Sequence, residues 1–457
     1  MMSFTSWQFA IFSAVVFGLY YLPIMRGWQV QILVVSSLIF YGSDQAKLLA
    51  LLAAAVFGTY GFLILAFKNR RLWLPFGIAF NLGLLAFFKY KFLFIDPAAA
   101  PLSNTAAVDF LLRLPLPIGI SFFVFHNISL LVDLTKRGGT APPLREVFLY
   151  IIFFPQLVSG PITRAANFLP QIKPKFIADV DYVEAAKWIV SGYFFKLFVA
   201  NNLNEITTNM DYPLFENLSI TNRWICLFLY SCQIYADFFG YSAVAVGLGL
   251  LFGYRLPINF NLPYISASFS EFWTRWHISL SQWLRTYLYI PLGGNRFGAT
   301  RTYVNLMIVM GLGGLWHGAA ISYLVWGLLH GLFLVAERPI LQRIETLSAN
   351  QNLLHAVRVG VVFFCVSMAW VLFKLPNFEH AVAYVHGMFV KPEIANPYPL
   401  YRGLALFYSL PVMIQHLAPP NWLERPRAAL EPYLYGTMAA LMLVEAGPST
   451  SFIYFQF

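Results

Sequence analysis

The sequence predicts an all-α protein that crosses a membrane several times. Hydrophobic residues make up 59% of the 457 residues and charged residues only 11%, whereas charged residues are about 25% of an average soluble protein. A soluble fold of this size could not bury so much apolar surface, but a bilayer removes the need to bury it. Because unpaired backbone groups are costly in lipid, the spanning segments should be helices.

Apolar segments recur along the whole chain and predict roughly 11–13 transmembrane or re-entrant helices. Several segments are shorter than the ~20 residues that a full crossing needs. Short or glycine-interrupted segments indicate broken helices beside a cavity, since irregular backbone is not tolerated against lipid. The segments are 7–23, 29–41, 48–67, 72–94, 117–134, 148–158, 185–199, 223–239, 242–252, 305–316, 321–335, 357–373, 404–414 and 433–444.

Charges in the early loops predict the orientation of the chain. Positive loops at Arg26, at 68–71 and at 136–145 alternate with acidic or nearly neutral loops. Because positive loops stay in the cytoplasm, we expect an extracytoplasmic N-terminus. The 30 Lys and Arg residues are scattered between apolar segments, so the net charge of +10 does not indicate nucleic-acid binding.

A single domain, residues 1–457, accounts for the sequence, which shows no internal repeat, low-complexity tract or soluble domain. The cysteines Cys226, Cys232 and Cys365 have no spacing typical of a metal site or a disulfide framework. We therefore expect no metal centre and no nucleic-acid partner. The lipid bilayer is the first partner that the composition predicts.

Asp237 ends an apolar segment and begins the motif DFFGYS, residues 237–242. A carboxylate at membrane depth is energetically expensive, which makes Asp237 a candidate functional residue. The alternative, a carboxylate that pairs with a nearby arginine for structural reasons, is equally well supported.

The segment 270–285 has the pattern of one amphipathic helix that Ser270 could cap. Its polar face carries Glu271 and Arg275, its apolar face carries tryptophans, and His277 lies at the border. Two interpretations are open: a helix lying on the membrane surface, or a helix lining a polar chamber inside the bundle. The serine and glutamine side chains favour the chamber.

His317 lies deep in an apolar segment, within GLGGLWHGA at 311–319. Glycine allows another backbone or a thin substrate to come close, and a buried neutral histidine can act as a base. The alternative, a core histidine bonded to a backbone carbonyl, is less favoured in this setting. His330 would point to another side of a straight helix and is interpreted as structural.

A turn is predicted before this segment, where Gly293 and Gly294 are followed by Asn295.

A long, ordered set of motifs covers most of the chain. They are FWTRWHISLS (272–281), LRTYLYIPLGGNR (284–296), GGLWHGA (313–319), DFFGYS (237–242), LPINFN (256–261), PQLVSGPI (155–162), GISF (119–122) and FFKY (87–90). Together these motifs resemble the membrane-bound O-acyltransferase family, and most of all its alginate O-acetyltransferase branch. The chain departs from that branch at Phe239, Ala243 and Thr286, which argues against roles for acidic residues there.

The resemblance implies a bundle around a central funnel or tunnel, with a catalytic core at residues 115–340. It makes His317 the principal catalytic histidine and His277 the second. Acyl transfer from a thioester needs a base for the attacking hydroxyl and hydrogen-bond donors for the oxyanion. The other candidates for the tunnel are Asp237, Tyr241, Arg275, Asn295 and Trp316, of which Tyr241, Arg275 and Trp316 could donate to the oxyanion.

The resemblance also implies acetyl-CoA as acyl donor and a bacterial cytoplasmic (inner) membrane as location. The acceptor would be an extracytoplasmic polysaccharide such as alginate or another exopolysaccharide. Because the chain has no soluble domain to hold a polymer, a separate extracytoplasmic acyltransferase should complete the reaction. The alternatives are O-acylation of peptidoglycan or teichoic acid, and a non-catalytic transporter or scaffold of a polysaccharide secretion complex; a transporter would show two related halves, which we do not find.

The C-terminal residues 451–457, SFIYFQF, form an aromatic tail without a charged side chain. The phenylalanines could plug a groove, with Tyr454 at the membrane interface. Alternatively, Tyr454 enters the extracytoplasmic mouth of the tunnel and accepts the acyl group, because a phenol of pKa about 10 leaves more readily than a sugar alkoxide. The tail resembles the Phe-x-Tyr-Phe ending of the companion peptide of teichoic acid D-alanylation, so Tyr454 joins the catalytic candidates.

Overall fold

The computed structural model describes residues 2–93, 109, 112–158, 160–344, 350–390, 399–418, 427–448 and 450. Most of these residues are helical and none of them forms a strand, which confirms the all-α prediction. Within this described part of the chain, six helices are long and apolar enough to cross a membrane: Pro23–Ser43, Ala46–Lys68, Arg70–Tyr90, Ile220–Leu251, Ile321–Leu341 and Gln351–Lys374. Together with the family assignment below, they make this chain a multi-pass membrane protein.

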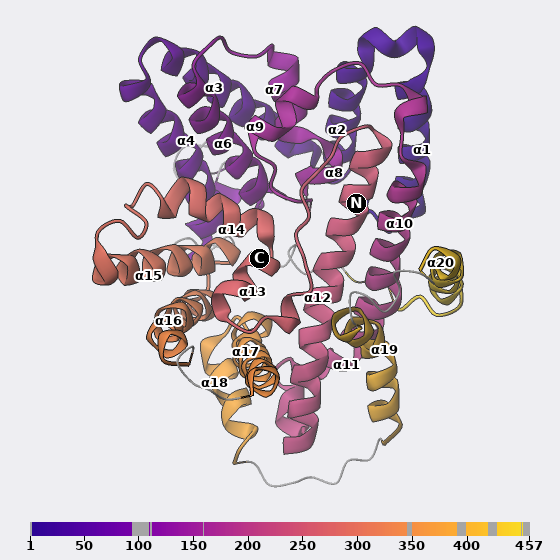
Figure 1. Ribbon diagram of the computed structural model, residues 1–457. Coiled ribbons are helices and arrows are strands. Elements are labelled where there is room, and N and C mark those ends of the chain that lie inside the picture. Colours follow the sequence, from indigo (N-terminus) through magenta and orange to yellow (C-terminus); the bar gives the residue numbers. More distant parts are fainter. Residues whose placement is uncertain are drawn as a thin grey trace. The chain divides into compact units, whose positions relative to one another are not determined.

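The chain divides into two compact units. The first unit comprises Met1–Ile189 and Val244–Pro257 and is drawn mainly in indigo and purple in Figure 1. It contains α1 (Trp7–Tyr21), η1 (Pro23–Trp28), α2 (Gln29–Gln45), η2 (Ala46–Leu48), α3 (Leu49–Lys68), α4 (Arg70–Tyr90), η3 (Lys91–Leu93), α6 (Ile120–Arg137), α7 (Leu144–Ile152), α8 (Phe154–Leu157), α9 (Ala165–Phe168), η4 (Leu169–Gln171), η5 (Ile177–Asp179) and most of α10 (Tyr182–Tyr193).

The second unit comprises Val190–Ala243 and Ile258–Phe457 and contains all the candidate site residues. Two of its elements, η6 and η10, are π-helices. Its elements are η6 (Phe194–Ala200), α11 (Asn201–Thr207), η7 (Thr208–Met210), η8 (Leu214–Asn217), most of α12 (Ile220–Leu251), η9 (Pro263–Ile265), α13 (Phe269–Arg275), α14 (Ile278–Leu284), η10 (Arg285–Tyr289), α15 (Gly298–His317), α16 (Ile321–Ile344), α17 (Gln351–Lys374), α18 (Phe378–Gly387), α19 (Pro399–Leu417) and α20 (Arg427–Val444).

Polar side chains join helices of the first unit. The amide of Asn127 on α6 donates to Asn81 Oδ1 on α4 over 2.7 Å, and the Asn81 amide donates to Thr59 Oγ1 on α3 over 3.0 Å. All three residues are buried. Such interhelical hydrogen bonds hold membrane helices together because lipid offers no other partner for the polar groups.

The helix α12 corrects one boundary of the sequence prediction. We expected separate apolar segments at 223–239 and 242–252, but Gly240 lies inside one continuous helix, Ile220–Leu251. An added Cβ at Gly240 would lie 2.8 Å from the carbonyl oxygen of Gly192 and 2.9 Å from the amide nitrogen of Lys196. The glycine therefore serves close packing against a neighbouring helix and does not break its own.

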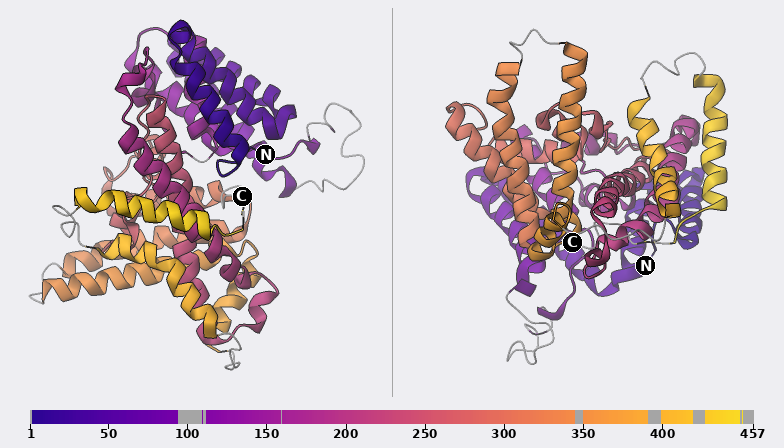
Figure 2. Two further views of the ribbon diagram at one scale, coloured as in Figure 1. Left: turned by 90° about the vertical axis from the view of Figure 1, so that its right-hand side faces the viewer. Right: turned by 90° about the horizontal axis from the view of Figure 1, so that it is seen from below.

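Glycines also bring α15 and α16 together, as the GLGGLWHGA motif predicted. An added Cβ at Gly314 would lie 2.1 Å from the carbonyl oxygen of Tyr323, and one at Gly327 would lie 2.2 Å from that of Met310. The two helices run side by side in Figure 1, and α16 packs in turn against α17 (Figure 2). This contact holds the end of α15, where His317 lies.

Replacing Gly314 with alanine should therefore separate α15 from α16. The backbone of Tyr323 cannot move aside as a side chain can, so we expect a loss of about 1–3 kcal/mol of unfolding free energy. Thermal unfolding of the purified protein in detergent measures the change. The matched control is Gly313→Ala, because an added Cβ there meets only a Leu284 methyl group at 3.4 Å; equal destabilisation by both changes would contradict the close-approach argument.

Candidate functional site

His277 lies at a break between two short helices, where the sequence predicted one continuous helix. The helix α13 ends at Arg275, α14 begins at Ile278, and His277 between them has a φ of 42° in the left-handed region. The cap also lies earlier in the chain than predicted, since the side chain of Ser268, not Ser270, accepts from the amide of Glu271. The break places the fully buried His277 ring inside the unit, which agrees with the chamber interpretation.

The motif LPINFN holds this break in place. The carbonyl oxygen of Asn259 accepts from the amide of Ile278 over 2.9 Å, and Asn259 Oδ1 accepts from Ser279 Oγ over 2.6 Å. Left-handed backbone at a residue other than glycine costs about 1–3 kcal/mol and persists only where the surroundings enforce it, often at functional sites. Asn259 is therefore a structural residue of the site that sequence reasoning missed; its only signal was its place in a motif.

The structure brings His277, Trp316 and His317 together. The ring centroid of Trp316 lies 6.0 Å from that of His277 and 4.9 Å from that of His317. The rings of Trp326 and Phe373 each lie 5.1 Å from His317 and cover it. Burial lowers the pKa of His277, so its imidazole is neutral near pH 7 and offers one donor and one acceptor.

His317 and His330 pack against the same tryptophan, because they lie on two successive helices and not on the one straight helix by which the sequence separated them. The chain leaves the helix after His317 and resumes at Ile321. The ring of Trp326 therefore lies 5.1 Å from His317 and 4.8 Å from His330. His330 is fully buried and packed among aromatic rings, including Trp273 at 5.2 Å, which fits the structural role that the sequence predicted.

Asp237 forms a buried ion pair with Lys196 on the π-helix η6. Lys196 Nζ lies 2.6 Å from Asp237 Oδ1, and the two side chains are only 2% and 5% exposed. The same ammonium lies 5.3 Å from the centre of the Tyr241 ring. Beside Asp237, Phe238 places its ring 4.6 Å from His277. The sequence left an ion pair with a nearby arginine as one of two equal interpretations of Asp237, and it offered no signal for Lys196.

The remaining candidates lie apart from this cluster or outside the described residues. Arg275 pairs with Glu271 over 2.9 Å on a partly exposed surface and donates to the carbonyl oxygen of Asn261. Asn295 is exposed in the turn before α15, whose glycines 293 and 294 have the positive φ values that the turn prediction requires. Tyr454 lies outside the described residues.

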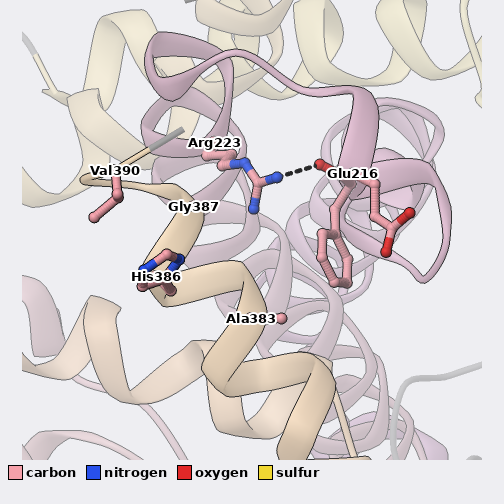
Figure 3. Close-up of a pocket in the computed structure, with 7 residues that line it drawn as sticks. Glu216, Arg223, Ala383, His386, Gly387 and Val390 are labelled. Carbon is pink, nitrogen blue, oxygen red and sulfur yellow. Dashed lines mark hydrogen bonds between the residues drawn. The ribbon is translucent and has the colours of Figure 1, made fainter. Parts of the chain in front are cut away.

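A cavity of about 300 Å³ opens elsewhere in the second unit (Figure 3). Its only arginine, Arg223, donates to the carbonyl oxygens of Phe215 over 2.7 Å and of Tyr384 over 3.2 Å. The guanidinium is thus occupied by backbone, and it lies so close to Gly387 that an added Cβ there would be 2.4 Å from Arg223 Nη1. None of the candidate residues lines this cavity, whose lining residues are Phe215, Glu216, Arg223, Ala383, His386, Gly387 and Val390. Within the described residues, no three His, Cys, Asp or Glu side chains gather as a metal site would require.

Comparison with known proteins shows the family of this chain. Residues 93–375, well over half of the chain, match the sequence model of the membrane-bound O-acyltransferase family, MBOAT. The chain belongs to this family. It is therefore an O-acyltransferase, and the matched range includes the predicted core and both candidate histidines of this MBOAT protein.

Relatives of this MBOAT protein act on different polymers, according to their names. The chain is 36% identical over 387 residues to the probable alginate O-acetylase AlgI of Pseudomonas putida, which covers 82% of this chain and 78% of that one. It is 34% identical over 390 residues to the peptidoglycan O-acetyltransferase of Helicobacter pylori, and this match covers 78% of this chain and 73% of the relative. It is 31% identical over 234 residues to the teichoic acid D-alanyltransferase of Bacillus subtilis, and this match covers 48% of this chain and 58% of the relative. These matches confirm the family that the motifs indicated.

Proposed function

We propose that this O-acyltransferase moves an acetyl group from cytoplasmic acetyl-CoA to a hydroxyl of an extracytoplasmic polysaccharide in a bacterial cytoplasmic membrane. The observation that carries the proposal is the pair of buried histidines, His277 and His317, whose rings both lie close to Trp316. The relatives named as O-acetylating enzymes match over more than three quarters of the chain, which favours acetyl over another acyl group.

The acetyl group is transferred in two steps, with Tyr454 of the C-terminal tail as the intermediate acceptor. His317 takes the proton of the Tyr454 hydroxyl, the phenolate attacks the thioester carbonyl, and the C–S bond breaks as the C–O bond forms. The imidazolium of His317 returns the proton to the thiolate of CoA. In the second step an acceptor hydroxyl attacks the tyrosyl ester and the phenol leaves, so the acyl group crosses through the predicted tunnel while CoA does not.

His277 acts as the second histidine in this scheme. Its neutral imidazole can donate to the developing oxyanion or orient the thioester, and both roles need the fixed geometry that the left-handed backbone supplies. Trp316, Tyr241 and Asp237 complete the tunnel wall beside the two histidines. Arg275 and Asn295 would contribute at the mouths of the tunnel.

Alginate or a related exopolysaccharide is the acceptor that the coverage of the relatives favours, and peptidoglycan is the second candidate. Membranes containing the protein and radiolabelled acetyl-CoA should label one polymer in the presence of its extracytoplasmic acyltransferase. Offering alginate, peptidoglycan and teichoic acid in parallel identifies the polymer. Full labelling of a polymer by the reconstituted protein alone would contradict the need for a partner, and no labelling of any polymer or of the protein would contradict the acetyl donor.

The direction of transfer requires a particular orientation. We expect the loop between α3 and α4 in the cytoplasm and the N-terminus outside, because Lys68, Arg70 and Arg71 cluster there. An Arg71→Cys variant in a Cys365→Ser background leaves the Asn69 cap of α4 intact. An impermeant maleimide should label it in inside-out vesicles and not in intact cells; the reverse pattern would invert the orientation.

A further inference from the structure

The segment that precedes the tail is held against η6 and α11 by hydrogen bonds. The amide of Gly447 donates to the carbonyl oxygen of Leu197 on η6 over 3.1 Å, and the side-chain amide of Asn202 donates to the carbonyl oxygen of Glu445 over 3.1 Å. An added Cβ at Gly447 would lie 2.7 Å from the Asn202 amide nitrogen. Backbone thus lies directly against backbone, and residues 445–448, together with Thr450, form a strap over the start of α11.

The last described residue of the strap is bonded to the buried ion pair. Lys196 Nζ donates to Thr450 Oγ1 over 3.0 Å while it pairs with Asp237 over 2.6 Å. Thr450 Oγ1 donates in turn to Asn201 Oδ1 over 2.8 Å. Thr450 thus lies in a polar site that is formed by the side chains of Lys196, Asp237 and Asn201.

Stability alone is a poor explanation for this ion pair. Removing two charges from water costs several kcal/mol per ion, and a well-packed apolar pair is often as stable. Lys196 also lies on a π-helix, a rare conformation that is frequent at functional sites. Because the buried ammonium makes a second hydrogen bond to the strap, it can select and hold one position of the C-terminal segment.

We propose that Lys196, paired with Asp237, is a positioning residue that anchors the C-terminal tail at Thr450. Phe238 follows Asp237 and contacts His277 at a centroid distance of 4.6 Å. Tyr454 is the fourth residue after Thr450, and an extended chain of four residues reaches about 13 Å. An anchor at Thr450 would keep the Tyr454 hydroxyl within that reach of Lys196 and so raise its local concentration there; only this last step rests on the proposed relay.

The first test removes only the hydroxyl of Thr450. Thr450→Val keeps the shape of the side chain and leaves the ion pair intact. Hydrogen exchange of residues 445–450 in the full-length protein, followed by mass spectrometry, should become faster by roughly tenfold, as the loss of one hydrogen bond to a charged group implies. The matched control is Thr208→Val, whose hydroxyl bonds the Asn204 carbonyl on an exposed surface and should leave this exchange unchanged.

The second test separates anchoring from folding. Lys196→Met removes the cationic partner of the buried Asp237 carboxylate, so we expect a less stable protein. The double variant Lys196→Met with Asp237→Leu should recover the thermal stability, because the apolar pair needs no desolvation. In this double variant, hydrogen exchange of residues 445–450 should remain as fast as in Thr450→Val. The transfer of label from radiolabelled acetyl-CoA to its tail should be at least tenfold slower than in the wild type.

The outcomes distinguish the anchor from the relay. Unchanged exchange in Thr450→Val, or full recovery of slow exchange and tail labelling in the double variant, would overturn the anchor. Fast exchange in both variants with no label on the tail of the wild-type protein would support the anchor and contradict the relay at Tyr454.

Discussion

His317→Ala is expected to lower acetyl transfer by about 10²–10⁴-fold, the usual contribution of a general base. The hydroxyl that attacks the thioester then keeps its proton, while the binding of acetyl-CoA should change little. Single-turnover release of CoA in detergent measures the chemical step without the polymer. Near-normal acetylation by this variant would contradict the catalytic role and favour a scaffold.

His330→Ala is the matched control for the cavity that His317→Ala creates. Both histidines contact Trp326 in the same aromatic cluster, so both variants should lose comparable thermal stability. Only His317→Ala should lose the chemical step. If the two variants lost activity equally, the loss would come from the disturbed cluster and not from the missing base.

A variant of His277 must respect the left-handed backbone. Asparagine adopts this conformation more readily than alanine does, so His277→Asn tests the imidazole with less strain. We expect a smaller loss than for His317→Ala, since His277 orients or donates and does not accept the proton of the attacking hydroxyl.

Tyr454→Phe is expected to abolish transfer to the polymer while the protein still folds and inserts. Phenylalanine keeps the aromatic surface of a plug and removes only the hydroxyl that would accept the acetyl group. Mass spectrometry of the C-terminal peptide after brief exposure to acetyl-CoA should find an added acetyl group in the wild type and none in the variant.

A second experiment gives this prediction a control inside the tail. Phe452→Leu changes an aromatic residue of the same tail and keeps the Tyr454 hydroxyl, so it should retain labelling of the tail. Wild-type acetylation of polymer by Tyr454→Phe would leave only the plug interpretation. A defect in Phe452→Leu as large as that of Tyr454→Phe would indicate a role of packing rather than of the hydroxyl.

Local patterns were sufficient for some features and misleading for others. The glycines of GLGGLWHGA predicted a close approach, and Gly314 makes one because its own backbone must meet that of Tyr323. The helical periodicity of 270–285 predicted an unbroken helix, but tertiary hydrogen bonds that Asn259 accepts outweigh local helix propensity at His277. The apolar segments 305–316 and 321–335 did indicate a break after His317, but only the structure shows that His317 and His330 pack against the same Trp326 ring.

The sequence by itself determined the all-α membrane fold and the family, together with the two histidines that carry the family's motifs. The composition excludes a soluble fold. A long, ordered set of motifs identifies a family without any knowledge of where the motifs lie in the folded protein. Only the tertiary structure decided that Lys196, 41 residues away along the chain, is the partner of Asp237, and that Thr450, 254 residues from Lys196, bonds to the same ammonium. The physical reason is that a buried carboxylate without a partner costs several kcal/mol, so the sequence can show that Asp237 needs a partner. Which residue becomes that partner depends on how helices that are distant in sequence pack together.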